Sequence, residues 1–101
     1  MDKLFKIKAD IQININGRKN PFSSGYRPGF SFFGNMQTTG HIELINEKEL
    51  YPGQSAIVNI YFFSDQLLGN IKSNSKFKFF EADIEIGFGK VIEIIGLQRV
   101  I

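Results

Sequence analysis

A chain of 101 residues has the size of a single domain with one hydrophobic core, and its lack of cysteine excludes disulfides and thiol-based metal or catalytic sites. The formal net charge of +2 does not by itself indicate nucleic-acid binding. The first residues lack a signal-peptide pattern, and no apolar run approaches the roughly 20 residues that span a bilayer. We therefore expect one cytoplasmic domain over residues 1–101, without a membrane segment.

The first predicted element is a strand from Phe5 to Ile15. Its odd positions are all apolar, with the small residue Ala9 among them, and its even positions are all polar. A period of two predicts a strand with one buried and one exposed face, since a helix would not keep these residues on one side. Turn-forming residues and two prolines follow, so residues 17–28 are predicted to form a long ordered loop.

Five further segments have the composition of strands, and they cover residues 30–33, 40–45, 55–63, 76–86 and 89–95. Pro52-Gly53 predicts a tight turn, and residues 65–75 a second long polar connection with room for a helical turn at 66–68. Gly87 and Gly89 predict a bulge or sharp bend between the last two strands. This succession predicts an all-β fold, either a small sandwich or a barrel. A closed barrel would leave fewer exposed strand edges.

The predicted loop carries a series of residues with a particular spacing. Gly17-Arg18, Pro21-Phe22 and the run from Gly25 to Phe30 stand in the order shown by the third, C-terminal domain of elongation factor Tu, which the chain resembles. Thr39 to Leu44, Pro52-Gly53 and the stretch from Phe79 to Val91 are similar to later landmarks of that family. The resemblance covers about residues 8–95. It implies a closed, six-stranded antiparallel β-barrel.

In that family the barrel packs on a GTPase domain, contacts the exchange factor and helps to hold the T stem of aminoacyl-tRNA. Here Gly89-Lys90 is followed by Val91 and lacks the upstream glycine of a P-loop, so nucleotide hydrolysis is excluded. The family's RNA-facing loop has two arginines and two glycines, whereas residues 80–84 share only Glu81 with it. Asp83 would repel a phosphate there. The resemblance therefore implies a stand-alone scaffold in which the family's mode of tRNA binding is not expected.

The candidate partner-binding residues are Arg18, Lys19, Tyr26 and Arg27. Two loop arginines and an aromatic ring can bind a carboxylate, a phosphate or the edge of a protein. The alternative is structural, because arginines in ordered loops often pair with acidic side chains or carbonyl oxygens and hold the loop in place. The sequence favours the structural alternative for Arg18 and Arg27.

Other residues that carry chemistry give little indication of catalysis. His41, the only histidine, is predicted on an outward face without partners for a metal or catalytic role. Most of the 11 phenylalanines are expected in the core, and Phe32, Phe33 and Phe88 are the ones that could instead be exposed. No catalytic residue, metal site or cofactor is predicted, and the chain is not expected to be an enzyme.

Two functions follow as hypotheses. The first is a protein-interaction module, since residues 1–40 carry a formal charge of +4 and residues 41–71 of −3, which offers complementary patches to a partner. The second is an RNA-binding or tRNA-binding barrel with a contiguous basic N-terminal strip, whose affinity would fall steeply with salt. That strip would consist of Lys3, Lys6, Lys8, Arg18 and Lys19.

Overall fold

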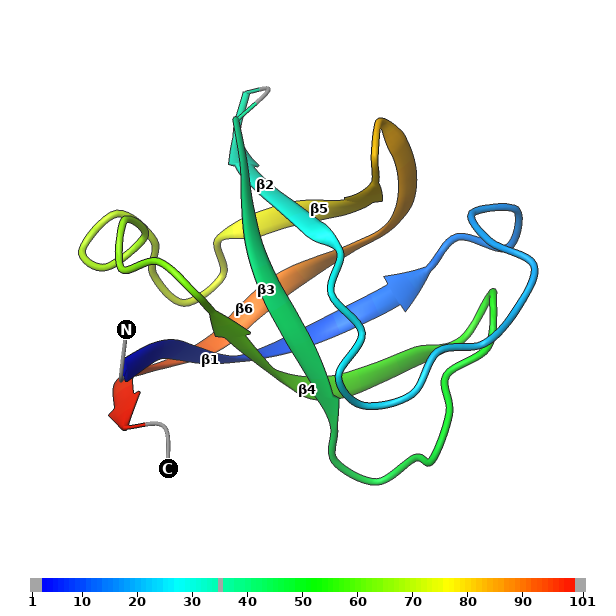
Figure 1. Ribbon diagram of the computed structural model, residues 1–101, viewed down its shortest axis with the longest axis horizontal. Helices are drawn as coiled ribbons and strands as arrows, with labels where there is room; N and C mark the ends of the chain where they lie inside the picture. The colour runs from blue at the N-terminus through cyan, green and yellow to red at the C-terminus, as the bar shows by residue number, and fades with distance from the viewer. Residues whose placement is uncertain (1–2, 35, 100–101) are drawn as a thin grey trace.

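The polypeptide forms a closed antiparallel β-barrel of six strands in the computed structural model, which describes residues 3–34 and 36–99 (Figure 1). The strands are β1 (Lys3–Ile13), β2 (Gly29–Phe33), β3 (Met36–Leu44), β4 (Ser55–Phe62), β5 (Lys76–Glu81) and β6 (Ile84–Arg99). Around the barrel they follow the order β1-β4-β3-β2-β5-β6. The all-β class and the small barrel are confirmed.

Strand β1 closes the barrel, because it is paired along one edge with β4 and along the other with β6. Its predicted alternation is confirmed from Phe5 to Ile13, where the side chains at odd positions are buried with at most 1% exposed. The strand ends at Ile13 and not at Ile15 as predicted, and Ile15 is 74% exposed. The intervening side chains, such as Lys6 and Lys8, lie on the outside. A strand with two paired edges and one apolar face is what a closed barrel requires of each of its members.

Phenylalanine rings fill one part of the barrel interior. Phe30 is fully buried and packs edge-on against Phe62, with ring centroids 5.1 Å apart and an interplanar angle of 77°. Its ring also lies about equally close to Phe77 and Phe79, at 6.0 Å each. Burial of each such side chain stabilises the fold by about 1.5–3 kcal/mol. These rings come from β2, β4 and β5, so the cluster joins strands that are far apart in sequence.

Strand β6 differs in its extent from the sequence expectation, which placed two strands on either side of a bulge or bend at residues 87–89. It is one strand of 16 residues, and the turn that precedes it lies at Ala82 and Asp83. An added Cβ at Gly87 would overlap the carbonyl oxygen of Gln12 and lie 2.5 Å from Cζ of Phe79. At Gly89 it would lie 2.6 Å from Cζ of Phe77. The two glycines therefore allow β6 to approach β1 and the core rings closely. The register with β5 shifts between Phe79 and Phe80 and leaves Ile86 without a partner on β5, so a bulge lies beside Gly87 as predicted, although the strand continues through it.

The two long connections, between β1 and β2 and between β4 and β5, lie where the sequence predicted loops. The long loop after β1 is fastened to the barrel by isolated bridges, Phe22 with Leu50 and Tyr26 with Ile42. Residues 65–70 form hydrogen-bonded turns, and no helix is present at 66–68. Residues 3–34 and 36–99 contain no helix with the length and apolarity needed to cross a membrane.

Substitution Gly87→Ala is expected to destabilise the chain by about 1–3 kcal/mol, since the methyl group would push Phe79 or the β1 backbone out of place. Urea unfolding followed by circular dichroism measures the loss. The control is Ile84→Ala at an exposed position of the same strand, which should lose less than about 1 kcal/mol. Equal stability of Gly87→Ala and the wild type would contradict the close approach.

Candidate binding surfaces

Arg18 lies within the long loop and is held by several groups at once. Its Nε donates a hydrogen bond to the carbonyl oxygen of Asn20 at 2.7 Å, and an Nη donates to that of Pro21 at 3.4 Å. Its other Nη forms an ion pair with the carboxylate of Glu81. The guanidinium group also lies 4.8 Å from the ring centroid of Tyr26. With 21% of its side chain exposed, Arg18 retains little surface for a partner.

Tyr26 shares the same carboxylate, because its hydroxyl donates a hydrogen bond to Glu81. Its ring stacks on Phe22 at a centroid distance of 4.3 Å and an angle of 22°. Its backbone carbonyl accepts a hydrogen bond from the amide of Ile42 at 2.9 Å. Burial and the hydrogen bond to Glu81 raise the pKa of Tyr26 above its ordinary value. Glu81 therefore anchors Arg18 and Tyr26 together, which corresponds to the structural alternative for this loop.

The other two residues of the predicted cluster have different surroundings. Arg27 is exposed, and its guanidinium group lies 5.0 Å from the ring centroid of Phe63 at the end of β4. Lys19 is exposed and forms no hydrogen bond or ion pair with the residues that the structure describes. The structure thus brings Arg18 and Tyr26 together on Glu81, while Arg27 contacts another part of the surface.

Arg27 belongs to a row of stacked cationic and aromatic side chains, here called the cation–aromatic row. His41 stacks on Tyr61 with centroids 4.9 Å apart and an angle of 18°, and it lies 5.8 Å from Phe63. The ammonium group of Lys6 lies 5.2 Å from the centroid of Tyr61. The row forms because Lys6, Tyr61 and His41 are register partners on β1, β4 and β3. The sequence placed His41 outward but could not show these neighbours.

The charge state of His41 depends on this row. Burial lowers the pKa of His41 below its ordinary value of 6.5, and the positive charge of Arg27 lowers it further. Glu43 acts in the opposite direction but does not cancel these two effects. The imidazole is therefore mostly uncharged at neutral pH, where it contributes an aromatic surface more than a positive charge.

A second surface lies at the tip of the hairpin formed by β2 and β3. Phe33 and Met36 flank this tip and are 51% and 61% exposed. With the turns at residues 66–70 they line a hollow of about 420 Å³, here called the hairpin-tip groove, whose residues carry no charge. Its lining consists of Phe33, Met36, Gln66, Leu67 and Asn70.

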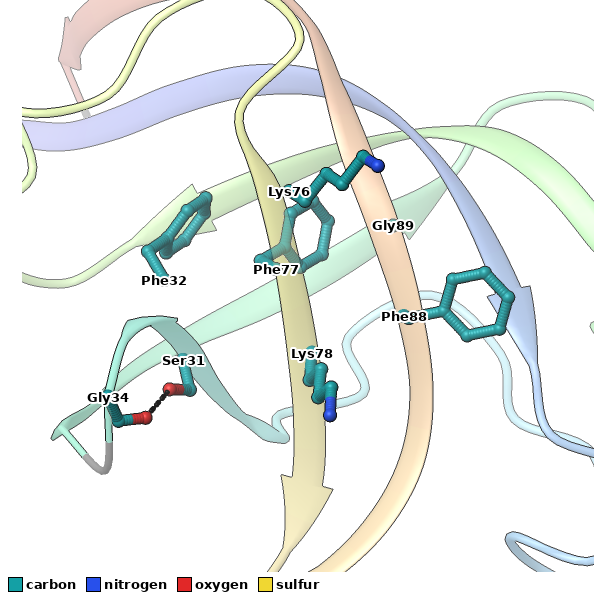
Figure 2. Close-up of a pocket in the computed structure, with 8 residues that line it drawn as sticks. All are labelled: Ser31, Phe32, Gly34, Lys76, Phe77, Lys78, Phe88 and Gly89. Atoms are coloured by element: carbon teal, nitrogen blue, oxygen red, sulfur yellow. Dashed lines mark hydrogen bonds between the residues drawn. The ribbon is translucent and has the colours of Figure 1, made fainter.

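A third surface lies on the outside of β5 and β6. Figure 2 shows Lys76 and Lys78 extending from β5 and Phe88 on the neighbouring β6, with its ring directed away from β5. This hollow has a volume of about 430 Å³. A second hollow of about 340 Å³ adjoins it, with Lys76, Phe88 and Gly89 lining both. We call the two hollows together the lysine groove.

Neither a cluster of metal ligands nor a match to a known family points to a function. Among residues 3–34 and 36–99, no three or more His, Cys, Asp or Glu side chains come together as metal ligands would. No protein-family model matches the sequence. The function of each of the three surfaces is therefore inferred from the residues that form it.

Substitution Glu81→Ala is expected to destabilise the chain by about 1–2 kcal/mol, because Arg18 loses its counter-charge and the Tyr26 hydroxyl its acceptor. The value allows for solvent screening, since 43% of the Glu81 side chain is exposed. Urea unfolding measures the change. Asp83→Ala removes the same charge from the neighbouring turn and should stay within about 0.5 kcal/mol of the wild type. If the two variants were equally stable, Glu81 would not be the anchor of the loop.

Substitution Arg27→Ala is expected to raise the pKa of His41 toward 6.5, leaving the part of the lowering that burial causes. NMR titration follows this directly, because the chain has a single histidine. The lowered pKa also means that the unfolded chain takes up a proton before the folded one. The free energy of unfolding should thus fall as the pH drops below about 6.5, and fall less in Arg27→Ala.

The matched control for this titration is Lys19→Ala, which removes one positive charge from the same loop away from His41. It should leave the pKa of His41 unchanged. A pKa that does not move in Arg27→Ala, or moves equally in both variants, would show that Arg27 does not act on the histidine.

Proposed function

We propose that this chain is a non-enzymatic interaction module for a cytoplasmic protein partner, related to the C-terminal barrel of elongation factor Tu, and that it binds through the hairpin-tip groove. The observation that carries the proposal is the exposure of Phe33 and Met36 beside a hollow without charged residues. In Figure 1 the hairpin of β2 and β3 projects from the barrel, where a partner can reach it.

The composition of the groove is that of the centre of a protein interface. Such centres are enriched in aromatic residues and methionine and depleted of charge. Methionine also adapts its shape to the surface that it meets. Gln66 and Asn70 at the edge offer amide groups for hydrogen bonds at the rim. An apolar side chain of a partner would therefore enter a surface that is already weakly hydrated.

Phe33 and Met36 are already about half buried, so a partner that covers the rest of each side chain would gain roughly half of the 1.5–3 kcal/mol of a full burial from each. Since 1.4 kcal/mol is a factor of ten in the dissociation constant, their loss would be easily detected. The remaining contacts would mainly provide shape complementarity.

The fold supports the proposed relation to the elongation-factor barrel, because a closed antiparallel barrel of six strands is what the resemblance implies. The residues that carry the resemblance in the long loop include Arg18 and Tyr26, which contact Glu81. A shared structural use of these residues would explain why the loop motif is present although the other residues of the RNA-facing loop differ.

The alternative, an RNA-binding or tRNA-binding barrel with a basic N-terminal strip, has less support from the geometry. Arg18 is neutralised by Glu81, and Lys6 lies over the ring of Tyr61. Lys3 is the first residue of β1 and Lys19 lies in the loop that follows its other end, and a strand of 11 residues spans roughly 35 Å. The five basic residues therefore do not form one contiguous positive face.

The test is affinity capture from the source cells with tagged chain, comparing the wild type with the double variant Phe33→Ser and Met36→Ser. We expect the wild type to retain a protein partner and the double variant to bind it at least tenfold more weakly, because each substitution removes buried apolar area. Titration of the purified partner by calorimetry gives the two dissociation constants.

The matched control is Ile84→Ser, at a 60% exposed position at the start of β6, which removes apolar surface elsewhere. It should bind like the wild type. Undiminished binding by the double variant would contradict the proposed surface. Recovery of nucleic acid in place of protein would contradict the proposed partner class.

A further inference from the structure

We propose that the lysine groove binds single-stranded nucleic acid, with bases stacked on Phe88 and phosphates held by Lys76, Lys78 and Lys90. This site shares no lining residue with the hairpin-tip groove, although Phe32 and Gly34 on either side of Phe33 line one of its hollows. It uses other residues than the basic N-terminal strip. It goes beyond the proposed protein-binding function and does not depend on it.

The first observation is a pair of like charges placed directly opposite each other. Lys76 on β5 and Lys90 on β6 are register partners, and like charges in that position destabilise a sheet. Lys76 forms no ion pair with the residues that the structure describes. Asp10, the register partner of Lys90 on β1, balances one of the two positive charges, so one positive charge remains in excess. An anionic ligand between the two ammonium groups would remove the repulsion.

The second observation is the ring of Phe88, which is 45% exposed. Its register partner on β5 is Lys78, and Lys90 follows two residues later on the same face. These neighbours stand about 5 Å and about 7 Å away along the sheet. An exposed aromatic ring among cations is the arrangement with which proteins bind unpaired bases, because every base has a face that can stack.

The third observation is the shape of the surface around that ring. The hollow of about 430 Å³ extends toward β2 and includes Ser31, and that of about 340 Å³ extends toward β1 and includes Gln12. Phe88 lines both, so a ligand chain could pass over it and occupy the two sides. The hydroxyl of Ser31 in the first hollow, and the amide of Gln12 and the hydroxyl of Ser55 in the second, are available for the edges of bases. Asp10 also lines the second hollow, where its carboxylate can accept a hydrogen bond from a base amino group.

These features favour a single strand over other anions. A duplex would keep its bases stacked on one another and present only phosphates, leaving Phe88 without a function. An acidic peptide offers carboxylates but no regular series of planar groups. Glu85 forms an exposed ion pair with Lys78 at 3.4 Å, which a phosphate can replace at small cost.

The experiment is fluorescence anisotropy with labelled 12-nucleotide single strands of RNA and DNA, a 12-base-pair duplex and a poly-glutamate peptide as probes. We expect the single strands to bind most tightly. The logarithm of their affinity should fall with the logarithm of the salt concentration with a slope of about −2, as for roughly three phosphate contacts. Tighter binding of the duplex or the peptide, or no binding at low salt, would overturn the proposal.

Two sets of variants separate stacking from charge. Phe88→Ala should weaken single-strand binding about tenfold with an unchanged salt slope. The double variant Lys76→Gln and Lys90→Gln should weaken it and reduce the slope to about −0.7. Its folding should be at least as stable as that of the wild type, because a repulsive pair has been removed. Wild-type affinity in Phe88→Ala would overturn the stacking site.

The charge control is the double variant Lys6→Gln and Lys19→Gln, which lowers the net charge equally on other parts of the surface. It should bind within about twofold of the wild type, whereas a loss equal to that of the Lys76 and Lys90 variant would show non-specific attraction and overturn the site. The double variant Phe33→Ser and Met36→Ser should bind the oligonucleotide like the wild type. The protein-binding proposal and the nucleic-acid proposal can therefore fail independently of each other.

Discussion

The close approach of β6 to β1 is the constraint on which the rest of the structure depends. Gly87 and Gly89 allow it, since a side chain at either position would meet the β1 backbone and the rings of Phe79 or Phe77. With β6 in this place the barrel closes, and the phenylalanine rings fill its interior. Phe88, between the two glycines, is turned outward. One local requirement therefore determines the core and also the ring at the centre of the lysine groove.

A second constraint fixes the long loop. Glu81, at the end of β5, holds Arg18 and Tyr26, while the backbone of Tyr26 is bridged to β3. The loop is thereby tied to two separated parts of the barrel. Because these side chains are used in the fold, the surfaces available to partners lie elsewhere, at the hairpin tip and on the outside of β5 and β6.

The sequence predicted what depends on short-range pattern. Alternation identified β1 and its buried face, and the turn formers located the long loop. It predicted the bulge beside Gly87 but wrongly divided β6 into two strands there, because a glycine pair is compatible both with the end of a strand and with a close approach to a neighbouring strand. The role of Glu81 was also hidden, since its partner Arg18 is 63 residues away. The facing of Lys76 and Lys90 likewise depends on strand register, which the pattern does not fix.

Binding at the hairpin tip is best tested by chemical-shift mapping of the isotope-labelled chain titrated with its purified protein partner. If the hairpin-tip groove is the binding surface, the signals of Phe33, Met36, Leu67 and the residues beside them change most, while those of the loop around Arg18 and Tyr26 stay in place. Changes centred on that loop, with the hairpin tip unaffected, would contradict it.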